Sequence, residues 1–146
     1  MVIALAAVII VSLSGSSESS RSVDEVAAQV TGLFENDKSE KSPERMFKKH
    51  YGLNAQDYEG VVLYSPISNM DAEELLIVKV SDPEQMDALV QAVKDRLETQ
   101  TNIYEGYAPA QYDLCLHAVT CEEGNFLLFV VHENADQIEA AFKKAL

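Results

Sequence analysis

The stretch Glu74-Leu75-Leu76-Ile77-Val78-Lys79-Val80, followed after Ser81 by Asp82-Pro83-Glu84-Gln85, decides the fold. Its apolar first part predicts a β-strand. A capping aspartate, a proline, an acid and then a glutamine predict the start of a helix. Apolar residues at helical spacing follow this start, namely Met86, Leu89, Val90, Val93 and Leu97. The segment therefore predicts a strand that leads directly into an amphipathic helix.

The geometry of this strand and helix predicts one side-chain contact. We expect Lys79 to face water, which places Glu74 on the opposite, helix-facing side of the strand. Glu74 lies about 20 Å from the turn at about 3.3 Å per residue. Arg96 returns about the same distance along the helix at about 1.5 Å per residue. We therefore expect a partly buried ion pair between Glu74 and Arg96, with Glu73 as an alternative partner.

The remaining patterns predict the rest of one domain. Helices are expected at 23–34, 43–51 and from 134 to the C-terminus, and strands at 61–65, 116–122 and 126–132. Residues 36–41 are polar and are expected to form a loop. The fold class is therefore α+β: a mainly antiparallel four-stranded sheet from two strand-strand-helix units, with two preceding helices packed against it.

The N-terminal region looks like a targeting segment rather than part of the fold. Residues 1–13 are almost wholly apolar, and residues 14–21 are rich in serine. An apolar helix of about twelve residues rises only about 18 Å, too short to span a hydrocarbon core of about 30 Å. We expect 1–13 to be an export signal or membrane anchor, 14–21 a linker, and 22–146 a single α+β domain.

That reading leaves two alternatives open and carries one exclusion. The usual Lys or Arg before the apolar run is absent, which a start assigned too far downstream would explain. The run could instead form a buried helix or strand of the domain. No cysteine lies near its end, so lipid attachment at a cleaved cysteine is not supported. We expect an extracytoplasmic protein, either membrane-anchored or secreted.

The charge of the chain restricts its partners. The formal net charge is −13, which argues against nucleic acid as a partner, because a phosphate backbone is bound through Lys and Arg. Basic residues gather in one short segment, at Lys38, Lys41, Arg45, Lys48 and Lys49. Such a patch could contact anionic lipid or an anionic wall polymer, but it is equally typical of a solvated helix face.

Several motifs in the second and last thirds carry a family resemblance. They are Tyr51-Gly52-Leu53, the strand from Ala72 to Lys79, Arg96-Leu97-Glu98-Thr99-Gln100, the segment Tyr104 to Gln111, and Gly124-Asn125-Phe126. On these residues the chain resembles exported Gram-positive bacterial proteins catalogued as domain of unknown function 4358. The resemblance implies a membrane-attached or lipidated protein outside the cytoplasm, without an established activity. Many members look like lipoproteins, and this chain departs from them by lacking the cysteine. It transfers no catalytic residues.

The segment Thr101–Asp113 is the strongest candidate for binding. It is long, shows no clear periodicity, and carries Tyr104, Tyr107 and Tyr112. Loops of this length are often functional, and tyrosine offers a flat amphipathic face to a peptide or a sugar. The alternative is that these tyrosines fold back as a lid on the core, with their hydroxyls bonded to the backbone.

Two metal sites were weighed and neither is predicted. Cys115, His117, Cys121 and His132 have zinc-binding side chains, but their spacing matches no compact motif. Cys115 and Cys121 are expected about 20 Å apart on one strand, too far for a disulfide. Asn69, Asp71, Glu73 and Glu74 alternate as calcium ligands do, but the glycine and the final bidentate acid are missing. No metal or cofactor is expected.

No motif for nucleophilic catalysis or phosphate binding is present. The first hypothesis is a non-catalytic accessory domain that binds a protein, peptide or envelope component through the tyrosine segment or a sheet edge. The alternative is a small cell-envelope enzyme, hydrolase-like, with an unrecognised site. A pocket where two or more of Glu73, Glu74, Arg96, His117 and Tyr107 converge would favour the enzyme. A third reading, a cytosolic regulator, requires residues 2–11 to pack into the domain.

Overall fold

The computed structural model describes residues 18–146, which form an α+β domain. The signal or anchor expected at 1–13, and the linker up to residue 17, lie outside the described residues. The described chain contains five antiparallel strands in one sheet, in the order β1-β2-β3-β5-β4. Their bounds are Ser39–Lys41 for β1, Gly60–Pro66 for β2, Glu74–Lys79 for β3, Val119–Glu123 for β4 and Phe126–Val131 for β5.

The fifth strand is the difference from the four that the sequence predicts. Edge strand β1 lies inside the segment expected to be a loop, where Glu40 pairs with Ser65 of β2. Its central strand residues are exposed, so no apolar alternation marks it in the sequence. Backbone pairing with β2 and a hydrogen bond from Ser39 Oγ to the Glu73 carbonyl at 2.8 Å hold it in place.

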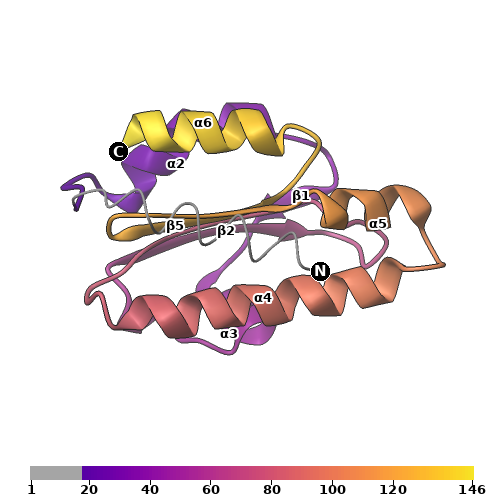
Figure 1. The fold of residues 1–146 in the computed structure, drawn as a ribbon, viewed down its shortest axis with the longest axis horizontal. Helices are drawn as coiled ribbons and strands as arrows, with labels where there is room; N and C mark the ends of the chain where they lie inside the picture. Colours follow the sequence, from indigo (N-terminus) through magenta and orange to yellow (C-terminus); the bar gives the residue numbers. More distant parts are fainter. Residues whose placement is uncertain (1–17) are drawn as a thin grey trace.

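Helices cover both faces of the sheet, with α2 and α6 on one side and α3 and α4 on the other (Figure 1). Their bounds are Val23–Phe34 for α2, Glu44–Tyr51 for α3, Gln85–Tyr104 for α4, Pro109–Leu116 for α5 and Ala135–Ala145 for α6. Alternate residues of β3 enter opposite cores: Leu75 and Ile77 contact the α2 and α6 side, and Leu76 and Val78 the α3 and α4 side. Because both faces are covered, β3 and β5 are continuous apolar runs.

Local signals in the sequence explain several helix ends. Ser22 and Glu25 form a capping box at the start of α2. Gly52 ends α3 at φ 72°, a left-handed conformation that costs glycine little. Before α4, Asp82 Oδ1 accepts from the Glu84 N–H at 2.9 Å. These bonds satisfy backbone groups that a helix start leaves without partners.

The single loop predicted at 101–113 is wrong. Helix α4 continues to Tyr104, a turn through Gly106 at φ 73° follows, and α5 begins at Pro109. The apolar pattern fails there because neighbouring side chains point to different surroundings: Tyr104 is buried, whereas Ile103 is exposed. Helix α5 also takes the first residues of the strand expected at 116–122, so Cys115 lies on a helix.

Within residues 18–146, no helix combines the length and the apolar character needed to cross a bilayer.

Candidate functional site

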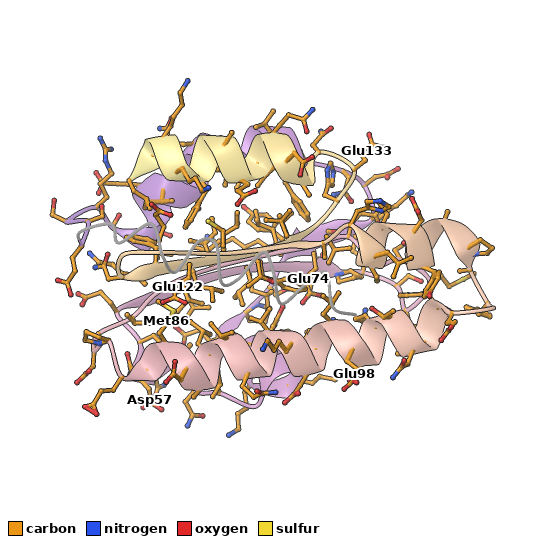
Figure 2. All side chains as sticks on the ribbon, viewed as in Figure 1. Asp57, Glu74, Met86, Glu98, Glu122 and Glu133 are labelled. Carbon is orange, nitrogen blue, oxygen red and sulfur yellow. The ribbon has the colours of Figure 1, made fainter. Side chains whose placement is uncertain are left out.

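A buried ion pair joins β3 to α4. Arg96 Nη2 lies 2.7 Å from Glu74 Oε1, and Arg96 Nε donates to Glu74 Oε2 at 3.1 Å. The Glu74 side chain is 2% exposed and the Arg96 side chain 10%. Figure 2 shows Glu74 in the layer between the sheet and α4. These are the two residues that the strand and helix distances predict to meet, and their bidentate geometry is the strong form of such a contact.

Tyr51, the last residue of α3, completes the network. Its hydroxyl donates a hydrogen bond to Glu74 Oε2. Burial, and then the negative charge of Glu74, raise the pKa of Tyr51 well above its usual value, so the hydroxyl stays a donor. Burial disfavours the charged form of Arg96, but hydrogen bonds and the charge of Glu74 outweigh this and raise its pKa. The network therefore fixes α3 and α4 to the sheet in one charge state.

Two hollows meet above this network, and together we call them the groove. The first hollow has a volume of about 580 Å³, and its lining includes Ile67, Ile103 and Tyr107. The second has a volume of about 520 Å³ and lies between α3 and α4. Arg96 and two residues at the end of α3, Lys49 and His50, line both hollows. The groove is therefore a continuous surface with Arg96 at its junction.

The charges around the groove are nearly balanced. Lys49 is exposed, while His50 is half-buried. Burial, followed by the charge of Arg96, lowers the pKa of His50 below its usual 6.5, so the ring is neutral near pH 7. Each hollow also contains one acid in its lining, Asp71 in the first and Asp95 in the second. Lys49 thus faces a surface on which most other charges have a nearby counter-charge.

The three tyrosines proposed as ligand contacts occupy different surroundings. The Tyr104 hydroxyl is committed to the β2–β3 connection, where it donates to the carbonyls of Asp71 at 2.7 Å and Asn69 at 3.1 Å. Burial raises the pKa of Tyr104 to about 12. Tyr107 is 63% exposed and lines the first hollow. Tyr112 is half-buried against the core on the α4 side and belongs to neither hollow.

Sequence reasoning missed the apolar rim of the groove. Ile67 on the β2–β3 connection is 59% exposed, and Ile103 near the end of α4 is 50% exposed. With Tyr107 they form what we call the apolar rim, and Met70, 61% exposed, lies on the same connection as Ile67. Isolated exposed isoleucines are ordinary, so only their gathering around one hollow distinguishes them. That gathering depends on tertiary structure and leaves no mark in the sequence.

Glu73, the alternative partner for Arg96, points elsewhere. Its Oε2 lies 3.7 Å from Lys38 Nζ, and its buried Oε1 has no hydrogen-bond partner among the described residues. Glu73 and Glu74 are neighbours on the chain and so project to opposite faces of the sheet. Only Glu74 can therefore reach α4.

The residues weighed as metal ligands do not assemble. Cys115 lies in the core on the α4 side and Cys121 in the core on the α2 side, and both thiols are free. The oxygens considered for calcium are divided between Tyr104, Lys38 and Arg96. Among residues 18–146 no group of three or more His, Cys, Asp or Glu is arranged to hold a metal ion.

Comparison with known families places the chain. Residues 34–132 match the family model described as "Domain of unknown function (DUF4358)", which is more than half of the 146 residues. The chain belongs to this family. The DUF4358 segment begins at the last residue of α2 and ends directly after β5. It therefore contains the whole sheet, α3, α4, α5 and every residue of the groove, while α6 lies outside it. Neither the curated proteins nor the solved structures contain a match.

Proposed function

We propose that this DUF4358 protein is a non-catalytic binding domain that works outside the cytoplasm, held at a membrane by its N-terminal segment. It binds a protein, a peptide or an envelope component through the groove. One observation carries the proposal: the apolar rim of Ile67, Ile103 and Tyr107 is exposed beside a hollow that has Arg96 at its base.

Clustered apolar exposure supports a binding role. Large apolar side chains gathered around a concavity and exposed to water are typical of interaction sites rather than of inert surface. Arginine and tyrosine are also the residues that contribute most often to binding energy at protein interfaces. The groove offers both, in Arg96 and Tyr107, beside aliphatic side chains.

The positions of the ends of β3 support an anchored arrangement. The Ser19 N–H donates to Asn125 Oδ1 at 2.9 Å, so the start of the described chain lies at the β4–β5 turn. That turn follows the Lys79 end of β3, whereas the β2–β3 connection with Ile67 lies at the Glu74 end. A segment that precedes residue 18 would therefore tether one end of the domain and leave the apolar rim at the other.

The alternative of a small hydrolase-like envelope enzyme has one observation in its favour. Arg96 and Tyr107 both line the first hollow, beside a neutral histidine, His50. A nucleophilic or acid-base site needs that histidine to be hydrogen-bonded to a hydroxyl or a carboxylate. Within residues 18–146 the His50 ring makes no such bond, and Arg96 is already paired with Glu74. Binding is therefore the better supported function.

Site-specific photo-cross-linking in the producing cell tests this proposal. A benzoylphenylalanine at position 107 or 103 should give a cross-linked adduct, because both side chains line the first hollow. The same residue at position 144, on the exposed surface of α6, is the matched control and should give none. The protein should also fractionate with membranes and be digested by protease added to intact protoplasts.

Equal cross-linking from positions 107 and 144 would contradict binding through the groove. A fully cytosolic, protease-protected protein would contradict the proposed location. Turnover of an ester or glycoside substrate that is lost in His50→Gln would favour the enzyme instead.

A further inference from the structure

We propose that the groove recognises one carboxylate of an acidic side chain in an extended peptide segment of a partner protein. The carboxylate binds Arg96 and Lys49 where the two hollows meet, and an apolar neighbour in the peptide packs on the apolar rim. This inference rests on the proposed binding function and names the chemistry of its ligand.

Arg96 is held ready for a second carboxylate. Its Nε and Nη2 donate to Glu74, and its Nη1 donates to Gln100 Oε1 at 3.3 Å. An arginine carries more N–H donors than these bonds use. Because the guanidinium is fixed by the sheet and by its own helix, little side-chain entropy is lost when a ligand binds. A carboxylate matches the planar fork of donors that a guanidinium presents.

Lys49 supplies the attraction that Arg96 alone does not. The charge of Arg96 is offset by Glu74 at 2.7 Å, so the pair is close to neutral from a distance. Lys49 lines both hollows, is exposed, and has no ion-pair partner within 4.0 Å among the described residues. A ligand carboxylate between Lys49 and Arg96 would therefore gain a charge-assisted contact from each.

The acids of the groove limit the ligand to a single charge. Asp71 lines the first hollow and Asp95 the second, so a polyanion that filled both would meet a carboxylate in each. Repulsion between like charges disfavours that arrangement. The apolar rim adds a second restriction, because a phosphate polymer has no apolar group to cover Ile103 and Tyr107. An acidic residue beside an apolar one in a peptide satisfies both requirements.

Titration of the full-length protein with matched peptides tests the inference. The probes are N-acetyl-leucyl-glutamyl-leucinamide and its glutaminyl analogue, which differ only in the charged group, together with inorganic polyphosphate. Two-dimensional NMR should show the Arg96 Nε–H resonance shifting with the glutamyl peptide. That peptide should bind about tenfold more tightly than the glutaminyl one, the usual value of a hydrogen-bonded charge.

Variants of one helix provide the control. Lys49→Gln should weaken the glutamyl peptide about tenfold and leave the glutaminyl peptide unchanged, because it removes the charge that faces the carboxylate. Lys48→Gln makes the same change in net charge on the neighbouring exposed residue, which lines neither hollow. It should change the affinity for the glutamyl peptide less than twofold, within the range of a distant, screened charge. Both sites are exposed, so neither substitution disturbs the core.

The outcomes separate this inference from the function on which it rests. Equal affinity for the two peptides, tighter binding of polyphosphate, shifts remote from Arg96, or no binding at millimolar peptide would each overturn the carboxylate assignment. If both peptides bind equally and Ile103→Ser weakens both, the groove still binds ligands and only the charge recognition is wrong. Failure of the cross-linking from position 107 would in addition remove the proposed function.

Discussion

Replacement of Arg96 by methionine should destabilise the domain strongly. The substitution keeps most of the buried aliphatic stem but leaves the Glu74 carboxylate, whose side chain is 2% exposed, without its cation. Charge centres in such a bidentate pair are about 4 Å apart, which corresponds to about 4 kcal/mol at an effective dielectric constant of about 20. Measured costs of removing one partner of a buried pair are about 3–5 kcal/mol. We expect the free energy of unfolding to fall by that amount.

Urea denaturation followed by circular dichroism measures this loss, and a compensated variant provides the control. Tyr51→Phe, Glu74→Leu and Arg96→Met together remove the stranded carboxylate and the hydroxyl that would lose its acceptor. Replacing a whole buried ionic group by apolar side chains of similar size is often neutral or stabilising. The triple variant should therefore recover most of the lost stability. If Arg96→Met alone costs less than about 1 kcal/mol, the range of exposed ion pairs, the network does not hold the helices to the sheet.

Three further predictions concern the two cores. Burial lowers the pKa of His132 below its usual 6.5, so the unfolded chain takes up the proton first. The free energy of unfolding should then fall as pH drops below 6.5, by up to about 1.4 kcal/mol per pH unit, and His132→Gln should flatten the slope of a pH series of urea melts. A Cβ added at Gly60 would lie 2.5 Å from Val23 Cγ1, so Gly60→Ala should cost about 1–3 kcal/mol in the same assay and Val23→Ala should restore part of it. Burial raises the pKa of Cys115 to about 11 and of Cys121 to about 12, so neither thiol should react with Ellman's reagent until urea unfolds the protein; rapid reaction of the native protein would contradict their burial.

The ion pair was predictable because its two elements share a turn. Glu74 and Arg96 lie similar distances from Ser81 along a strand and a helix of known rise, so counting residues brings them together. The α+β class followed from the same capped strand-to-helix signals. Edge strand β1 was not predictable, because Ser39–Lys41 has no apolar pattern and is defined only by its pairing with β2.

The groove could not be derived from the sequence. Its walls come from the end of α3, the β2–β3 connection and the last turns of α4, and their meeting depends on the packing of both layers. The tyrosine pattern indicated the correct region but not the role of each residue. Tyr104 hydrogen-bonds two backbone carbonyls, as the alternative of a core lid anticipated, while Tyr107 remains exposed at the rim.

The most direct test of the central claim is a crystal structure of the full-length protein grown with N-acetyl-leucyl-glutamyl-leucinamide. The account predicts the peptide in the groove, with its carboxylate oxygens within hydrogen-bond distance of both Arg96 and Lys49 and a leucine side chain against Ile103 and Tyr107. A peptide bound at another surface, or a carboxylate directed away from Arg96, would contradict it.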